Sequence, residues 1–143
     1  MPRAPLVVLD TNVLVSALLK RASKPGQILD LALAGQLRLA FDMRILQEYR
    51  DVVARPKFGI DPSAAEAVLS YLQIAGLAVD VSGKEHDPLS MDDPADLPFA
   101  EVALVAQVDA LVTGNIRHFG GLDRLGVVVQ TPAEFLQYYT SLV

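Results

Sequence analysis

The chain alternates short, continuous apolar runs with longer stretches in which apolar residues recur at helical spacing. A continuous apolar run is typical of a strand that is buried on both faces of a parallel sheet. Such runs predict strands at residues 6–9, 37–41, 77–81, 110–113 and 127–129. Because strands that alternate with helices pair in parallel, the pattern predicts a three-layer α/β/α sandwich around a mainly parallel sheet of about five strands.

Capping residues and prolines predict where the intervening helices begin and end. The predicted helices run through residues 13–15, over 27–34, from the cap Asp42 to Arg55-Pro56, over 62–75, from the cap Asp93 to about residue 107, and from Thr131 onward. Asp61-Pro62 and Asp93-Pro94 each combine a cap residue with a proline at the first helical position. Residues 131–134 have the form of a capping box.

The amino-acid composition limits the classes of protein to which the chain can belong. The 143 residues, 52% of them hydrophobic and 20% charged, predict one folded domain over residues 1–143. The chain has no cysteine, and with only His86 and His118 a dedicated zinc site is not expected. No apolar run approaches the roughly 20 residues of a membrane helix, so we expect a cytoplasmic protein.

The net charge of −5 argues against binding nucleic acid through phosphate contacts alone. Such a function becomes compatible with this charge only if bound cations neutralise acidic groups where the phosphate lies.

Several acids are expected to meet at one edge of the sheet. Asp10 ends the first predicted strand and Asn115 follows the fourth, and the carboxyl ends of parallel strands share an edge. On their helices, Glu48 borders the buried stripe and Asp96 leans toward it, whereas Glu101 points away and should be solvated. Partly buried carboxylates repel one another, and hard oxygen ligands suit Mg²⁺ or Mn²⁺. The sequence therefore predicts a divalent metal site.

Each of these residues also has an ordinary structural explanation. Asp10 could simply cap the next helix, Glu48 could be a helix-flank residue, and Asp93 is a good N-cap. Asp96 could complete that capping arrangement. Residues 113–115 could be only a turn, and His118 could be a surface or packing residue. Four cations could be ordinary solvated charges: Arg44, Arg55, Lys57 and Arg117.

Taken together and in order, four stretches and a short fifth one resemble the PIN domain family, and most closely its subgroup of toxin components from toxin–antitoxin systems. They are residues 8–17 (VLDTNVLVSA), 48–58 (EYRDVVARPKF), 93–103 (DPADLPFAEVA), 110–119 (ALVTGNIRHF) and 132–136 (PAEFL). The resemblance covers nearly the whole chain. Any one stretch is weakly specific, but the ordered set is strongly so.

The resemblance implies roles for individual residues. Asp10, Glu48 and Asp96 would be the metal-binding acids, and Asp93 an auxiliary acid. Asn115 stands where the family often has a fourth acid; its amide oxygen can coordinate a cation but cannot act as a base, so one ion or two remain compatible with the sequence. The residues implied to support the site or contact substrate are Thr11 or Asn12 beside Asp10, Thr113, and Arg117 or His118 for phosphate.

The implied activity is hydrolysis of single-stranded RNA by metal-activated water, leaving a 5′-phosphate and a 3′-hydroxyl. The implied partners are RNA and an antitoxin protein. A homodimer is also expected, because the last helix carries more apolar residues than one face needs: Phe135, Leu136, Tyr138, Tyr139 and Leu142. Two alternatives are a catalytically weak PIN-fold binding module, suggested by Asn115, and a receiver-like domain phosphorylated on aspartate.

Overall fold

The computed structural model describes residues 4–82 and 91–143; His86 and most of the predicted loop around it lie outside these residues. Five strands form one sheet in the order β3-β2-β1-β4-β5, and every pairing is parallel, as the sequence predicted. The strands are β1 (Leu6–Leu9), β2 (Arg38–Phe41), β3 (Leu77–Ala78), β4 (Ala110–Val112) and β5 (Val129–Gln130).

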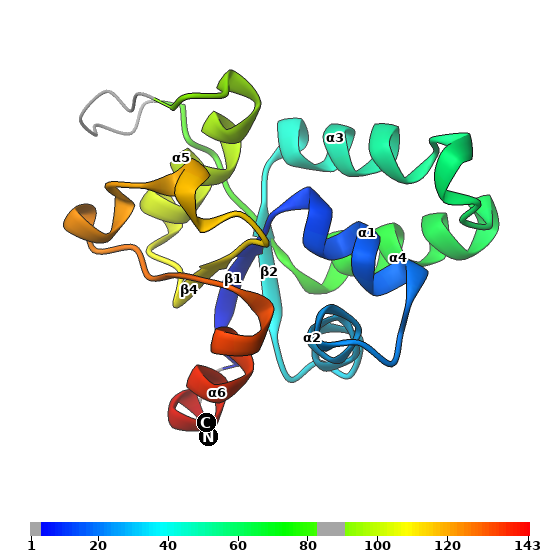
Figure 1. The fold of residues 1–143 in the computed structure, drawn as a ribbon, viewed down its shortest axis with the longest axis horizontal. Coiled ribbons are helices and arrows are strands. Elements are labelled where there is room, and N and C mark those ends of the chain that lie inside the picture. The colour runs from blue at the N-terminus through cyan, green and yellow to red at the C-terminus, as the bar shows by residue number, and fades with distance from the viewer. Residues whose placement is uncertain (1–3, 83–90) are drawn as a thin grey trace.

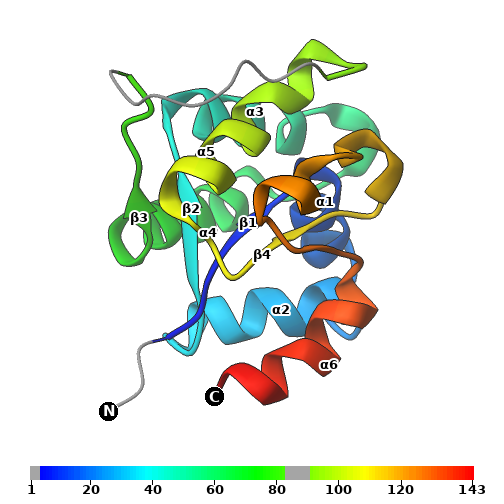
Figure 2. The same cartoon turned by 90° about the vertical axis from the view of Figure 1, so that its left-hand side faces the viewer.

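Six α-helices surround the sheet: α1 (Thr11–Leu19), α2 (Lys24–Leu33), α3 (Met43–Val53), α4 (Pro62–Ala75), α5 (Leu97–Ala106) and α6 (Pro132–Leu142). Helices α1 to α4 lie on one side of the sheet and α5 on the other, which gives the expected three layers (Figures 1 and 2). Helix α6 returns to pack against α2, β4 and β5. Within the described residues, none of these helices combines the length and the apolarity needed to cross a membrane.

The strand order changes direction between β1 and β4. From β1 the chain passes through α1 and α2 to β2 on one side, whereas α5 leads back across the sheet to β4 on the other. In open α/β sheets, ligands bind beyond the carboxyl ends of the strands at such a point. Val112 pairs with Leu9, so Asp10 and Thr113 directly follow paired residues there.

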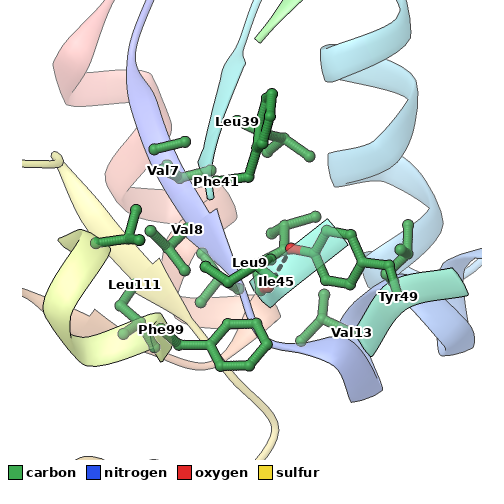
Figure 3. Packing of buried hydrophobic residues seen from close by; sticks show 14 of the residues in the cluster. Val7, Val8, Leu9, Val13, Leu39, Phe41, Ile45, Tyr49, Phe99 and Leu111 are labelled. Atoms are coloured by element: carbon green, nitrogen blue, oxygen red, sulfur yellow. Dashed lines mark hydrogen bonds between the residues drawn. The ribbon is translucent and has the colours of Figure 1, made fainter. Parts of the chain in front are cut away.

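The core is centred on β1, whose residues Val7, Val8 and Leu9 are fully buried (Figure 3). The buried Tyr49 of α3 donates a hydrogen bond from its hydroxyl to the Leu9 carbonyl oxygen, at 2.5 Å. Its ring also lies 6.3 Å from that of Phe99 on α5. Tyr49 therefore ties α3 to the last residue of β1, and this places its neighbour Glu48 near Asp10.

Two helices begin at other positions than predicted. Helix α2 begins at Lys24, three positions earlier than expected, because Ser23 caps it by accepting a hydrogen bond from the Gly26 amide and Pro25 fits its first turn. The helix predicted from Asp93 is instead a 3₁₀ turn, η2 (Pro94–Asp96), followed by α5. Pro98 at the start of α5 has no N–H group for a continuous helical ladder.

The two edge strands are shorter than predicted. Strand β3 ends at Ala78 rather than residue 81, and β5 begins at Val129 because the amide of Val127 donates to Leu122 in the preceding turn.

The predicted solvation of Glu101 was also wrong. Its carboxylate forms an ion pair of 2.8 Å with Arg44 on α3, because α5 and α3 pack together at this edge.

The apolar side chains of helix α6 are more deeply buried than the sequence predicted. Its capping box is present, with Thr131 and Glu134 each accepting a hydrogen bond from the other's backbone amide. Phe135 is fully buried, and the four other apolar residues of this helix named above are partly buried against the core. The homodimer prediction assumed that these side chains were free, and it loses that support.

The tie between Tyr49 and β1 can be tested by Tyr49→Phe. The change leaves the Leu9 carbonyl without its buried hydroxyl donor, so the free energy of unfolding should fall by about 1–2 kcal/mol. Urea unfolding followed by circular dichroism measures this. Tyr71→Phe, at an exposed position on α4, is the matched control and should change stability little. Equal effects of the two changes would contradict the assigned role of Tyr49.

Candidate functional site

Asp10 lies at the junction of β1 and α1 and is only 7% exposed. Its Oδ1 accepts a hydrogen bond of 2.9 Å from the Thr11 amide, and its Oδ2 accepts one of 2.7 Å from the Thr113 hydroxyl. Asp10 therefore does cap α1, as the ordinary explanation holds, and it also lines the cavity described below. The two roles are compatible because each carboxylate oxygen can accept more than one contact.

The turn after β4 supports Asp10 from the neighbouring strand. Thr113 is fully buried, and its hydroxyl oxygen accepts a 2.9 Å hydrogen bond from the Asn115 amide while it donates to Asp10. Asn12 holds the same turn by accepting a 3.4 Å hydrogen bond from the Gly114 amide. The 113–115 turn thus fixes the orientation of the Asp10 carboxylate.

Glu48 is half-buried on α3 and reaches the same region. The Thr11 hydroxyl donates a hydrogen bond to Glu48 Oε2. Thr11 therefore contacts both acids, Asp10 through its backbone amide and Glu48 through its side chain. The family resemblance implied that Thr11 or Asn12 would support Asp10, but it did not imply that Thr11 would also hold Glu48.

Asp96, at the end of η2, is 8% exposed, and its Oδ2 accepts no hydrogen bond from the described residues. His118 Nδ1 lies 3.1 Å from that oxygen without the alignment of a hydrogen bond. The other ring nitrogen of His118 lies 2.9 Å from the side-chain nitrogen of Asn115. Asp93 caps η2 by accepting a 2.9 Å hydrogen bond from the Ala95 amide.

The acids share one cavity of about 450 Å³. Its lining residues are Asp10, Thr11, Asn12, Val15, Ser16 and Leu19 from the start of α1, Glu48 and Val52 from α3, Arg55 and Phe58 at η1 (Pro56–Phe58), Asp93, Ala95 and Asp96 at η2, and His118 from η3 (Ile116–Phe119). Three predicted site residues do not line it. Thr113 is buried and acts through its hydrogen bond to Asp10, whereas Asn115 and Arg117 are exposed. Asn115 is linked to the site through His118 and Thr113.

Arg55 and Phe58 are among the lining residues to which sequence reasoning assigned no role in the site. A signal for Arg55 was present. Glu48, Val52 and Arg55 are spaced i, i+4 and i+7, which places them on one helical face. Arg55 follows the last turn of α3 and stays on that face. Nothing in the local pattern pointed to Phe58, because its position depends on how η1 turns back.

The carboxylates destabilise one another in their charged forms. Burial raises the pKa of Asp10, although hydrogen bonds from Thr113 and Thr11 and the nearby His118 act in the opposite direction. Burial, followed by the charge of Asp10, also raises the pKa of Asp96. The pKa of Tyr49 is raised chiefly by its burial and further by the charges of Asp10 and Glu48. The site therefore concentrates negative charge that a cation would relieve.

The chemistry of the donor set fits a hard divalent cation. Asp10, Glu48 and Asp96 present carboxylate oxygens to one cavity, and Asp96 has a buried oxygen with no hydrogen bond from the described residues. These are the ligands that Mg²⁺ and Mn²⁺ prefer. In residues 4–82 and 91–143, no three acidic or histidine side chains already enclose a metal position, so an ion would have to draw the carboxylates together.

Comparison with known proteins gives one family and one fold. Residues 6–117 match the PIN domain family. The chain is also similar in structure to VapBC2 from Rickettsia felis, which was solved bound to a DNA fragment from its promoter. The two chains are 22% identical, the match covers 88% of this chain and 98% of that chain, and the TM-score is 0.59. At 22% identity this similarity shows the fold alone. The search of curated proteins finds no match.

The raised pKa values predict how stability depends on pH. The carboxyls of Asp10 and Asp96 bind protons more tightly in the folded than in the unfolded chain, so the free energy of unfolding should fall as the pH rises from the ordinary value of 3.8 through the raised pKa values. Asp96→Asn removes one of these buried charges. In EDTA it should raise the Tm at neutral pH, and this advantage should shrink as the pH falls toward 3.8.

Thermal unfolding over a pH series measures this difference. The control is Asp51→Asn, which changes an exposed acid on α3 and should leave the pH dependence as it is in the unaltered chain. A lower Tm for Asp96→Asn than for the unaltered chain at neutral pH would show that the charged Asp96 does not destabilise the folded protein.

Proposed function

The chain belongs to the PIN domain family, and on this basis we propose that it is an endoribonuclease that hydrolyses single-stranded RNA with Mg²⁺ or Mn²⁺. One observation supports the proposal most strongly. Asp10, Glu48 and Asp96, which are far apart in the sequence, line one cavity beyond the carboxyl ends of the strands. A shared cavity of carboxylates has no structural benefit by itself, because their mutual repulsion costs stability.

In this proposal Asp10, Glu48 and Asp96 would hold the cation, and Asp93 would add negative charge beside it. When bound, the cation would supply activation of a water molecule and neutralisation of charge on the phosphate. Thr113 and Thr11 keep the carboxylates of Asp10 and Glu48 oriented, so these acids do not have to be ordered when substrate arrives.

His118 is proposed to contact the phosphate of the substrate. It lines the cavity beside Asp96, and Asn115 holds its ring by a 2.9 Å contact. Arg117, the other candidate for this role, lies outside the cavity lining. The acidic net charge is compatible with an RNA substrate because the cation supplies positive charge at the cavity.

We also propose that the chain, as one domain, is the toxin of a toxin–antitoxin pair, with a protein antitoxin as its partner in the cytoplasm. Two observations support this. The ordered motifs resemble the toxin subgroup of the family, and the fold is similar to that of VapBC2 from Rickettsia felis.

The catalytic proposal predicts loss of cleavage when any of the three acids is neutralised. Asp10→Asn, Glu48→Gln and Asp96→Asn should each slow cleavage of a labelled single-stranded RNA in Mn²⁺ by roughly 100-fold or more, because each removes a charged ligand of the cation. Mn²⁺ should also raise the Tm of the unaltered chain more than that of these variants. Asp51→Asn, on the outer face of α3, should behave like the unaltered chain. Cleavage that survives both EDTA and Asp10→Asn would rule out the mechanism.

A PIN-fold binding module without efficient catalysis is the second candidate, because the neutral Asn115 lies outside the cavity lining. The same assay separates the two with Asn115→Asp. If this change creates cleavage in a chain that otherwise shows none, the natural protein is a binding module. If the unaltered chain already cleaves RNA, the module is excluded.

The toxin proposal predicts growth arrest. Expression of the unaltered chain in a bacterial host should stop growth, whereas Asp10→Asn, with the cation site impaired, should not. Colony counts after induction measure the effect, and matched expression levels are confirmed by immunoblot. Normal growth with both chains would argue against a toxin.

A further inference from the structure

One part of the cavity wall is basic and apolar rather than acidic. Arg55 is the one lysine or arginine among the described residues that lines the cavity. It is exposed, and it forms no ion pair or hydrogen bond through its side chain with any residue in ranges 4–82 and 91–143. An arginine beside four carboxylates would be expected to pair with one of them, yet its guanidinium is left available for another anion.

The ring of Phe58 lines the same part of the wall and is half-buried. Val15, Leu19 and Val52 add apolar surface to the cavity. Binding of a metal ion and a phosphate needs no such surface. A flat apolar group that enters together with the phosphate would use it, and a nucleobase is such a group.

Lys57 adds a second positive charge at this place. It does not line the cavity, but its ammonium lies 5.1 Å from the centroid of the Phe58 ring. Lys57 and Phe58 lie in η1, which begins with Pro56; Arg55 precedes it at the N-cap position, and Gly59 follows it with a φ of 61°. Proline restricts the backbone at one end, and glycine allows the left-handed turn at the other.

We propose that Arg55, Lys57 and Phe58, here called the rim, bind one nucleotide of the single-stranded substrate next to the bond that is cut. Arg55 pairs with its phosphate, Phe58 stacks on its base, and Lys57 strengthens the positive field. The inference rests on the proposed nuclease function, and it assigns that function a substrate subsite. Because every base has an apolar face, this subsite selects single-stranded over double-stranded nucleic acid rather than a particular sequence.

Charge favours a nucleotide over an apolar peptide at the rim. The rim places two cations, Arg55 and Lys57, beside one aromatic ring, and a polyanion of phosphates and bases complements both features. The carboxylates across the rest of the cavity would repel such a chain until a cation is bound. The rim therefore gives RNA a place to bind that does not depend on the acids.

The test measures binding of a labelled single-stranded RNA by anisotropy in the Asp10→Asn background, where cleavage is impaired. Arg55→Gln should weaken binding roughly tenfold at low salt and reduce the slope of log affinity against log salt by about 0.7, the value for one phosphate on a single strand. Phe58→Leu should weaken binding roughly tenfold at every salt concentration and leave the slope unchanged. Arg38→Gln, which removes one charge at the opposite end of the sheet, should do neither.

Phe58→Trp provides a second readout, because the chain has no tryptophan of its own. Its fluorescence should be quenched by the RNA and not by an abasic oligonucleotide of the same length. The inference is overturned if Arg55→Gln and Phe58→Leu bind RNA as Arg38→Gln does, or if the abasic strand quenches equally. It is also overturned if the rim variants lose binding to an acidic apolar peptide while RNA binding is unchanged.

The outcomes separate this inference from the proposed function. If a chain with Asp10 intact cleaves RNA in Mn²⁺ and the rim variants keep its KM, the nuclease proposal is supported and the rim proposal is contradicted. If that chain never cleaves RNA but RNA binding still depends on the rim residues, the rim is an RNA-binding site and the nuclease proposal is contradicted. Unchanged Tm values exclude misfolding, since Arg55 has no partner to lose among the described residues and leucine preserves the apolar contact of Phe58.

Discussion

Burial of the Asp10 carboxylate governs how the polar groups around it are arranged. A charged group with so little exposure must be satisfied by nearby donors. The Thr11 amide and the Thr113 hydroxyl meet this need from opposite sides. They can do so because β1 and β4 are neighbouring parallel strands, so residues that are 103 positions apart in the chain end at the same level of the sheet. The polar network at this edge is therefore built by the sheet topology.

The other two acids reach Asp10 by different routes. Tyr49 fixes α3 on the end of β1, and Thr11 then holds the Glu48 carboxylate. Asp96 arrives from the far side of the sheet, where η2 and α5 begin, and faces His118. Both routes bring negative charge toward a carboxylate whose pKa is already raised by burial. The fold thus accepts a local loss of stability at one site, as functional sites commonly do.

The distribution of charge around the cavity is uneven in a way that suits an anionic polymer. The acids are gathered where a cation is proposed to bind, while Arg55 and Lys57 lie on the rim beside Phe58. A net charge of −5 therefore says little about what this cavity attracts. Binding of a phosphate chain depends on the local field, which in the proposed mechanism a bound ion and the rim would together make positive.

The five parallel strands, most helix caps, and the placement of Asp10 and Thr113 at strand ends could be predicted from the sequence, because apolar runs and capping residues act over a few neighbouring positions. Four features could not be predicted in this way: Thr11 contacts Glu48, Glu101 pairs with Arg44, Asn115 lies outside the cavity, and Phe58 lines it. Each of these depends on the angle at which one element packs on another or on how a short turn ends. Such angles are set by contacts between residues distant in the chain, which no local pattern records.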